Sequence, residues 1–387
     1  MQSNYKRLGD YIQEVNIRNK DLKEYPLLGV SIQKRVMPSI ANIIGTDMST
    51  YKLIQKNQFA YGPVTSRNGD KISIALLDSY ENALVSQAYT VFEVIDENEL
   101  HPEYLMMWFR RPEFDRYARF MSHGSAREIF SWTEMCDTLL PIPSPEKQIE
   151  IVREYNVIQN HIALNKRIIS KLEETAQGIY KQWFVDFEFP DDNGLPYKSN
   201  GGEMFWCEEF EKEIPEGWRL GTLEDLYKFQ YGLGNTNPNN NGQYPIYGAG
   251  GLIGGYDKFN SEDAPVIGHM GAYCGAVMFA FGKHYVTYNG VICQAKSDKH
   301  KWFSYLSLLS KDLMSHTRGS SQPFVSYDML YEIEIIIPKD KCANEFDYLT
   351  NKLFEKIRLK LLENQKLSEL KDLLLTKMTK VETELIL

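Results

Sequence analysis

The sequence has few of the features that mark membrane, secreted or metal-binding proteins. Its five cysteines are scattered through 387 residues, odd in number, and none forms a C-x-x-C pair. This pattern argues against a disulfide framework and against a cysteine-based zinc site. No apolar run approaches the ~18 residues that a membrane span needs, and the start MQSNYKRLGD does not resemble a signal peptide. We therefore expect a cytoplasmic protein with no membrane segment and no metal site.

Patterns that would bind a cofactor or perform catalysis are also missing. The glycine-rich string YGAGGLIGGYD (247–257) has Ile253 where a dinucleotide-binding loop requires its third glycine. The string GAVMFAFGKH (275–284) fails the phosphate-loop pattern in its spacing and its final residue. His269 and Cys274 have no other metal-ligating residues near them in the sequence at the spacing of a metal site, and they are interpreted as core or loop residues. We expect no catalytic residue and no cofactor in this chain.

Basic residues are outnumbered, but the acidic excess is confined to one segment. The formal net charge is −9, and residues 185–217 alone hold ten acidic and two basic side chains, a balance of −8. Because the remainder is close to neutral, the net charge does not exclude a nucleic-acid partner. The acidic segment is expected to face solvent or a protein. An arginine run allows either a basic face or a merely solvated helix face: Arg110, Arg111, Arg116 and Arg119.

The chain carries the same device twice. HGSAREIFSW (123–132) returns as RGSSQPFVSY (318–327), 195 positions later, and KRLGDYI (6–12) resembles WRLGTLEDL (218–226), with the Arg-Leu-Gly steps 212 apart. The second unit is therefore shorter by 212 − 195 = 17 residues. The length also exceeds what one hydrophobic core usually serves. We predict a duplicated domain whose shared edges are a scaffold and whose variable interior is a recognition surface.

A long helical pattern follows each unit. Ser144 and Pro145 are a typical N-cap and first helical residue. In the first helix the apolar positions recur every 3.5 residues, the period of a coiled coil, and the second helix repeats this pattern less regularly. The predicted seams are Ile151, Tyr155, Ile158, Ile162, Asn165, Ile169, Leu172, Ala176, Ile179 and Trp183 in the first helix, and Phe354, Ile357, Leu361, Asn364, Leu367, Leu370 and Leu374 in the second. We expect the two helices to pair antiparallel.

These patterns predict an α/β (α+β) fold with two globular recognition domains, a two-helix coiled coil between them and an internal pseudo-two-fold repeat. The expected segments are a first domain at 1–145, a central helix at 146–184, an acidic connector at 185–217, a second domain at 218–340 and a C-terminal helix at 341–387.

Part of the repeated device is architectural. Ser131 and Glu134 form a capping-box pattern, with Phe130 and Met135 at hydrophobic-staple spacing. The second copy keeps the serine cap at Ser326 and an apolar pair at Val325 and Leu330, but it has Met329 in place of the glutamate.

The residues that differ between the copies suggest DNA reading. His123 and Arg127 become Arg318 and Gln322, and Arg suits guanine or phosphate whereas Gln suits adenine. Asn68-Gly69 indicates a tight hairpin turn that would present its neighbours to phosphates. The alternative is that all of these are exposed loop positions free to drift. The predicted DNA-binding set is Arg67, Asn68, Lys71, His123, Ser125, Arg127, Arg318, Ser320 and Gln322.

The order of domain, helix, domain, helix resembles the DNA-specificity subunits of Type I restriction-modification systems. The strings that carry this resemblance run along essentially the whole chain: NQFAYGPVTSRNGDKISIAL (57–76), PEYLMMWFRRPEFDRYARFMSHGSAREIFSW (102–132), LNKRIISKLEETAQGIYKQWFVDFEFPDDNGLPYKSNGG (164–202), EIPEGWRLGTLEDL (213–226) and YGAGGLIGGYDKFN (247–260).

The resemblance implies a non-catalytic subunit with double-stranded DNA as its ligand, each domain reading half of a bipartite target. It implies that the helices dock two methyltransferase subunits, that nuclease/translocase subunits join the complex, and that S-adenosylmethionine, ATP and Mg²⁺ belong to those partners. The expected partner-binding residues are Asn165, Arg167, Trp183, Phe184 and Asn364. The alternatives are a helical scaffold with two protein-binding lobes and no DNA contact, and a self-sufficient modification enzyme. The target sequence itself cannot be predicted.

Overall fold

A computed structural model describes residues 5–41, 44–66, 68–123, 128–234, 237–297, 299–319 and 323–378. The chain forms two compact units. Unit 1 comprises Met1–Leu164 with Asn364–Leu387, and unit 2 comprises Asn165–Glu363. Each long helix therefore contributes one part to each unit, because the division falls within both helices.

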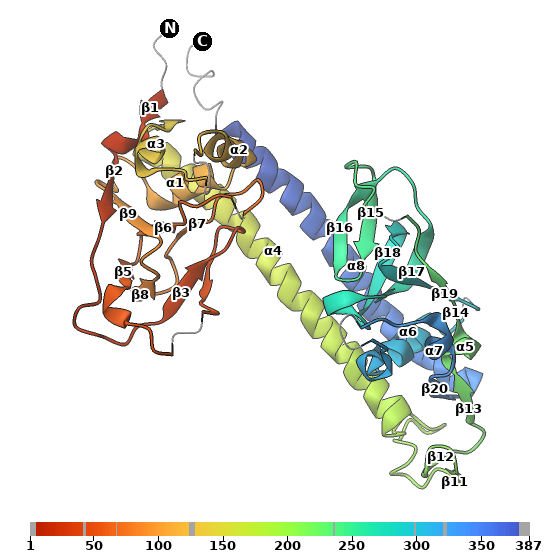
Figure 1. Ribbon diagram of the computed structural model, residues 1–387. Coiled ribbons are helices and arrows are strands. Elements are labelled where there is room, and N and C mark those ends of the chain that lie inside the picture. The colour runs from red at the N-terminus through yellow and green to blue at the C-terminus, as the bar shows by residue number, and fades with distance from the viewer. Residues whose placement is uncertain are drawn as a thin grey trace. The chain divides into compact units, whose positions relative to one another are not determined.

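Unit 1 contains two four-stranded sheets and one strand pair (Figure 1). The sheet orders are β2-β9-β6-β7 and β4-β3-β8-β5, and β1 pairs with β10. All of these pairs are antiparallel except β3 with β8. The bounds are β1 (Tyr5–Arg7), β2 (Ile12–Val15), β3 (Leu27–Val30), β4 (Val36–Pro38), β5 (Lys52–Gln55), β6 (Phe59–Tyr61), β7 (Ile74–Leu76), β8 (Asn82–Val85), β9 (Thr90–Val94), β10 (Leu139–Pro141), α1 (Pro102–Phe109), α2 (Pro112–Phe120) and α3 (Trp132–Cys136), with short 3-10 turns at Leu8–Asp10 and Met48–Thr50.

The core of unit 1 is rich in aromatic rings. Phe59 on β6 stacks on Phe92 of β9 at 4.8 Å between ring centroids, and Phe109 at the end of α1 meets both rings edge-on. Aromatic pairs of this geometry stabilise a core beyond the burial of their area. Helix α1 buries almost every side chain that it carries, which places it inside this core and not on a solvated face.

Unit 2 is built on one six-stranded sheet of order β14-β19-β17-β18-β15-β16. The strand pairs β13-β20 and β11-β12 complete its β structure, and β15 with β18 is the parallel pair of the main sheet. The bounds are β11 (Met204–Cys207), β12 (Lys212–Pro215), β13 (Arg219–Thr222), β14 (Tyr227–Tyr231), β15 (Tyr244–Gly248), β16 (Gly251–Tyr256), β17 (Ser261–Gly268), β18 (Val277–Val286), β19 (Gly290–Ala295), β20 (Glu334–Ile337), α5 (Leu223–Leu226), α6 (Lys301–Leu309) and α7 (Tyr327–Tyr331), with 3-10 turns at Gly271–Tyr273 and Leu313–His316.

The two ends of each sequence repeat are joined as strands. In unit 1, β1 pairs with β10, so that Arg7 of the Arg-Leu-Gly step faces Leu139. In unit 2, β13 pairs with β20, so that Arg219 faces Ile337. In each unit the first sequence anchor therefore pairs with the strand that follows the second anchor, and the variable interior is the chain between the paired strands.

The long helices are α4 (Pro145–Tyr180), which continues as a π-helical turn at Lys181–Val185, and α8 (Asp340–Lys377). The backbone N–H of Lys147 donates to Ser144 Oγ at 3.4 Å, which confirms the predicted N-cap. In unit 1 the start of α4 shares a core cluster with the end of α8. In unit 2 the end of α4 meets the start of α8, where the Trp183 and Phe346 ring centroids lie 5.6 Å apart. The helices therefore pair antiparallel, and the predicted fold class is confirmed.

The predicted seam holds along α4 and fails in part along α8. Every predicted α4 position is buried or half-buried. In α8, however, Leu361 and Leu370 are 43% and 49% exposed, whereas Leu375 and Met378 are buried. The predicted α8 positions follow steps of 3, 4, 3, 3, 3 and 4 residues, a mean of 20/6 = 3.3, which is shorter than the ~3.6 residues of a helical turn, so the assignment drifts off the contact face.

The acidic segment 185–217 is a folded part of unit 2. It contains the β11-β12 hairpin, and it buries Phe187 and Phe189 against Trp218, with ring centroids 5.6 Å and 5.0 Å from that indole. Acidic side chains such as Glu208 and Glu213 stay exposed. The segment is thus anchored by its aromatic residues and not a loose linker.

Candidate nucleic-acid interface

In unit 1 the repeated device begins with a pair of backbone hydrogen bonds between His123 and Ile129. The His123 N–H donates to the Ile129 carbonyl at 3.1 Å, and the Ile129 N–H donates back to the His123 carbonyl at 2.9 Å. This two-way bridge closes the segment between them, of which residues 124–127 lie outside the described part of the chain. We call the segment 123–129 the first bridge loop.

A second loop is attached to this one. The loop 62–73 joins β6 to β7, and its Thr65 N–H donates to the Glu128 carbonyl at 2.9 Å. The Phe130 N–H donates in turn to the Pro63 carbonyl, also at 2.9 Å. Because the hydrogen bonds alternate across the two segments, the first bridge loop and the β6-β7 loop are held side by side as a short sheet.

Unit 2 repeats this arrangement with a different sequence. Arg318 and Phe324 exchange hydrogen bonds of 3.0 Å and 2.9 Å and close the segment 318–324, the second bridge loop. Gly271 N–H donates to the Pro323 carbonyl at 3.1 Å, and Val325 N–H donates to the His269 carbonyl at 3.0 Å. The partner here is the β17-β18 loop, 269–276. The two units therefore present the same pair of loops on the same hydrogen-bonded frame.

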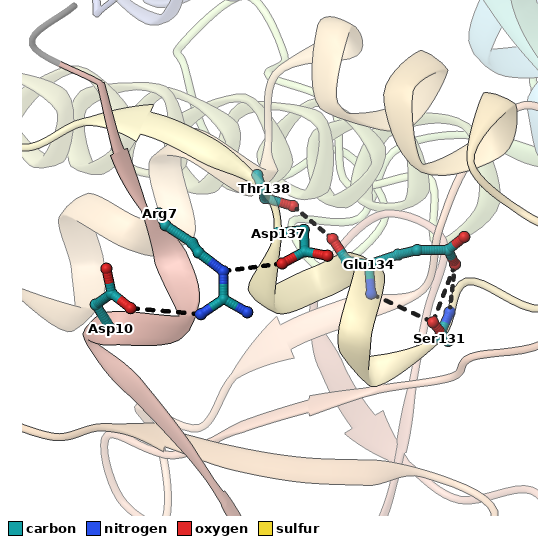
Figure 2. Close-up of polar contacts among 6 residues, drawn as sticks. All are labelled: Arg7, Asp10, Ser131, Glu134, Asp137 and Thr138. Atoms are coloured by element: carbon teal, nitrogen blue, oxygen red, sulfur yellow. Dashed lines mark hydrogen bonds and ion pairs between the residues drawn. The ribbon is translucent and has the colours of Figure 1, made fainter.

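The frame of unit 1 is anchored by the predicted capping box (Figure 2). The Glu134 N–H donates to Ser131 Oγ at 3.2 Å, and the Ser131 N–H donates to the Glu134 carboxylate at 3.0 Å. At the other end of α3, Arg7 Nε donates to Asp137 at 2.8 Å, which ties the helix to β1. The capping box is confirmed, and it fixes the chain immediately after the bridge loop.

The second copy lacks that cap. Ser326 is the N-cap residue of α7, but its side chain makes no capping hydrogen bond, so the predicted serine cap is wrong in this respect. Met329 replaces the glutamate and has no carboxylate to accept from the backbone N–H of Ser326. The apolar pair is kept instead: Val325 and Leu330 are both fully buried in one core cluster.

A buried ion pair fixes the far end of the β6-β7 loop. Lys34 Nζ lies 2.7 Å from an oxygen of Asp115 on α2, and it also donates to the Phe109 carbonyl. The same carboxylate oxygen accepts from the Ile72 N–H at 3.1 Å, where the loop returns to β7. Burial lowers the pKa of Lys34, and the attraction of Asp115 opposes that effect.

The predicted DNA-binding residues divide by their placement. Lys71 and Arg318 are exposed. His123 is exposed as well, and its Nε2 lies 3.3 Å from Glu134. Asn68 is half-buried, and its side chain donates to the Val64 carbonyl at 3.3 Å, so it supports the loop. Five of the set lie outside the described residues and stay predictions: Arg67, Ser125, Arg127, Ser320 and Gln322.

The predicted tight turn at Asn68-Gly69 exists, but it is not the whole connection. Gly69 has φ +62°, and the Lys71 N–H donates to the Asn68 carbonyl at 3.3 Å. The strands end at Tyr61 and resume at Ile74, so this turn is the tip of a longer loop. The extra length is what reaches the bridge loop.

The arginine run does not form an open basic face. Arg111 is buried, lies over the Trp108 ring at 4.2 Å and lies 3.4 Å from Glu113. Arg116 lies 3.3 Å from the same Glu113, and Arg119 is paired with Glu128 of the first bridge loop. Arg111 therefore ties the start of α2 to α1 and Arg119 ties its end to the first bridge loop, whereas the Arg116 pair lies within α2.

Known proteins resemble this chain in sequence and in fold. A model of the Type I restriction modification DNA specificity domain matches residues 215–372. The MjaIX specificity subunit of Methanocaldococcus jannaschii is 26% identical over 316 residues, which cover 74% of this chain and 70% of the relative. Residues 215–372 thus resemble a Type I DNA specificity domain, and the chain is similar in sequence to a Type I specificity subunit over most of its length. The HindI specificity subunit of Haemophilus influenzae is 25% identical over 189 residues, 47% of this chain and 40% of that protein.

A solved structure shares the fold of this chain. The crystal structure of the Type I restriction-modification S subunit from M. genitalium matches 97% of this chain and 95% of that one, with a TM-score of 0.53 and 16% identity. Within the described residues, no helix has the length and apolar character to cross a membrane, and no group of His, Cys, Asp or Glu side chains is placed to hold a metal ion.

The predicted partner-binding residues lie in different surroundings. Trp183 and Phe184 are 7% and 4% exposed and pack inside unit 2, which leaves little of either ring for a partner. Asn165 is fully buried in the α4 seam and Asn364 is half-buried, whereas Arg167 is exposed. Of this set, Arg167 offers the most accessible side chain.

The β17-β18 loop was missed from the sequence as the counterpart of the β6-β7 loop. His269 and Cys274 were correctly interpreted as loop and core residues, since Cys274 is 2% exposed and His269 Nδ1 lies 2.7 Å from the Val325 carbonyl. In the sequence, the available sign that this loop is equivalent to the β6-β7 loop is Gly271, which follows β17 closely. That sign can be interpreted only when the Gly271–Pro323 hydrogen bond is known.

Proposed function

We propose that this chain is a non-catalytic DNA-specificity subunit, in which unit 1 reads one half of a bipartite duplex target and unit 2 reads the other half. The observation that carries the proposal is the duplicated pair of loops. Each unit presents a bridge loop beside a hairpin loop on matched hydrogen bonds, while the exposed residues differ: Lys71 and His123 in unit 1, Arg318 in unit 2. A constant frame with changed side chains suits two different half-sites.

We further propose that the long helices dock two methyltransferase subunits, and that nuclease/translocase subunits join through the complex. Each unit leaves an apolar groove beside its helices. In unit 1 a groove of about 500 Å³ is lined by exposed residues including Val157 and Leu373. In unit 2 a groove of about 460 Å³ is lined by Val185 and Leu309 among others. Exposed apolar surface beside paired helices suits a protein partner. S-adenosylmethionine, ATP and Mg²⁺ would belong to those partners.

A selection experiment tests the proposal. The full chain, with and without its methyltransferase subunit, is incubated with duplexes that contain a randomised segment long enough for two half-sites, and the bound DNA is sequenced. We expect two short conserved stretches separated by unspecified base pairs. Mapping of methylated positions in the host genome should return the same two stretches.

Two results would overturn the proposal. Binding of the complex without any sequence preference would favour a scaffold that holds other proteins and does not read DNA. Methyl transfer by the isolated chain would favour a self-sufficient modification enzyme.

A further inference from the structure

Tyr273 is an exposed aromatic residue beside the second bridge loop. It ends the 3-10 turn at Gly271–Tyr273 in the β17-β18 loop, and 61% of its surface is accessible. A large aromatic side chain at a loop tip loses apolar burial unless a ligand covers it.

The backbone on both sides of Tyr273 is fixed. Gly268 N–H donates to the Ala276 carbonyl at 2.8 Å, and Gly275 N–H donates back to the Gly268 carbonyl at 2.9 Å. Cys274, the next residue, is buried in the core of unit 2, and its N–H donates to the Gly271 carbonyl at 3.0 Å. With the following side chain held inside the core, the loop conformation is set and the tyrosine ring is left at the surface.

The Tyr273 ring also packs against the backbone of a neighbouring turn. A Cβ atom placed on Gly250, in the turn between β15 and β16, would lie 2.7 Å from Cδ2 and 2.9 Å from Cε2 of Tyr273. The ring therefore lies against the bare backbone of Gly250, and any larger residue there would displace it. One side of the ring is supported by the glycine-rich turn, and the remainder is open.

The register of the two units gives Tyr273 a counterpart. Gly271 and Thr65 make the same hydrogen bond to their bridge loops, to Pro323 and Glu128 respectively. Tyr273 follows Gly271 by two positions, as Arg67 follows Thr65 by two positions in the sequence. In the sequence, therefore, the position of unit 1 that corresponds to Tyr273 is an arginine.

We propose that Tyr273 is a specificity-determining residue of unit 2, which contacts the duplex through its exposed ring and without charge. This inference rests on the proposed function. An aromatic ring recognises DNA by apolar contact with base edges, such as the thymine methyl group, or by packing between base steps. Neither contact releases counterions, so the loss of Tyr273 has a different salt signature from the loss of a cation.

The test uses the full chain with its methyltransferase subunit, the randomised duplex pool, and duplexes made from the selected sequence with one half-site scrambled at a time. Tyr273→Ala should weaken binding about tenfold. The bases selected at one half-site should become less defined, those at the other should not change, and the slope of log affinity against log salt should stay that of the wild type. Tyr273→Phe should retain most of the affinity, because the ring remains.

Gly250→Ala should weaken binding at the same half-site, because it moves the Tyr273 ring. In the double variant Gly250→Ala should cause no further loss of affinity beyond that of Tyr273→Ala. Tyr80→Ala is the matched control: Tyr80 is 38% exposed in unit 1, in the turn between β7 and β8 at the opposite end of β7 from loop 62–73. Wild-type affinity and selection by Tyr273→Ala would overturn the inference while the proposed function stands, and so would equal damage to both half-sites. A wild-type complex that selects no sequence would overturn both.

Discussion

Lys34 and Asp115 form an ion pair of 2.7 Å inside unit 1, and the same carboxylate holds the backbone of Ile72 at the end of the β6-β7 loop. The Lys34 side chain is 6% exposed and the Asp115 side chain 11%. A carboxylate removed from water in this way depends on its partner, because an unpaired buried charge is strongly destabilising. The pair therefore connects the stability of unit 1 to the position of a candidate DNA loop.

We predict that Lys34→Met lowers the free energy of unfolding of unit 1 by about 3–5 kcal/mol, because it leaves Asp115 buried without its cation. The double variant Lys34→Met, Asp115→Leu should lose much less than the sum of the two single variants. Urea unfolding followed by circular dichroism measures both. The matched control is Lys56→Met, which breaks an exposed 2.7 Å pair with Glu81 and should leave the free energy of unfolding close to that of the wild type. A loss for Lys34→Met no larger than the control would contradict the prediction.

The two serine caps should respond differently to the same substitution. Ser131→Ala removes a capping box with hydrogen bonds in both directions and should destabilise unit 1 by about 1 kcal/mol. Ser326→Ala removes no capping hydrogen bond and should change the unfolding free energy of unit 2 very little. The midpoint of denaturant unfolding for each variant checks this, and equal losses at the two positions would refute it.

Local rules explain why much of the architecture could be predicted from the sequence. Three predicted features depend on residues that lie within one or two helical turns of their neighbours. They are the start of α4 at Ser144, the successive positions of its seam from Ile151 to Trp183, and the capping box at Ser131. Such interactions leave a readable spacing in the sequence. The repeat added a long-range constraint, since identical spacing in both copies required one frame, and the two bridges have that spacing.

The remaining features depend on contacts that leave no spacing signature. Lys34 and Asp115 are 81 positions apart, and nothing in the intervening sequence indicates their pairing. Trp183 is a predicted partner-binding residue, but its ring packs inside unit 2 against Phe346 of the other long helix. Tyr273 was overlooked because its equivalence to Arg67 follows from backbone hydrogen bonds and not from any resemblance between the two loops.

The stability of unit 2 should fall in mild acid because of His284. Its ring is fully buried, Nδ1 donates to the Gly282 carbonyl at 2.8 Å, and burial lowers its pKa below the usual 6.5. Below pH 6.5 the unfolded chain therefore binds a proton at this histidine that the folded chain does not bind. The free energy of unfolding is retained above pH 6.5 and decreases as the pH falls below it, with a limiting slope of about 1.4 kcal/mol per pH unit. His284→Phe should flatten this part of the curve of unfolding free energy against pH between about 5 and 7. An unchanged curve in the variant would exclude His284 as its cause.

Lys71 should act on affinity more than on sequence choice. It is exposed at the tip of the β6-β7 loop, where a lysine suits a phosphate oxygen. Lys71→Ala should weaken binding to all duplexes alike and lower the salt slope by about one unit, and Arg67→Ala should do the same. Fluorescence anisotropy titrations at several salt concentrations give the slope, with Lys56→Ala as the exposed control. A slope equal to that of the wild type would remove Lys71 from the phosphate contacts.

Arg127 and Gln322 allow the two half-sites to be changed separately. Each residue lies four positions after the first residue of its bridge, His123 or Arg318, so the repeat assigns them equivalent places. We predict that Arg127→Gln alters only the half-site read by unit 1, and that Gln322→Arg alters only the half-site read by unit 2. Arginine pairs with guanine O6 and N7 and glutamine with adenine N6 and N7, so each exchange should cost about 1–3 kcal/mol on the original base and move the preference toward the base that suits the new side chain. Selection from the randomised duplex pool, followed by titration with duplexes that carry one altered half-site, measures both effects.

Because the bridge hydrogen bonds are made by backbone atoms, neither substitution should disturb the frame, and the unfolding midpoint should stay close to that of the wild type. If either substitution changed both half-sites together, the units would not read DNA independently, and the division of labour between the two bridge loops would have to be abandoned.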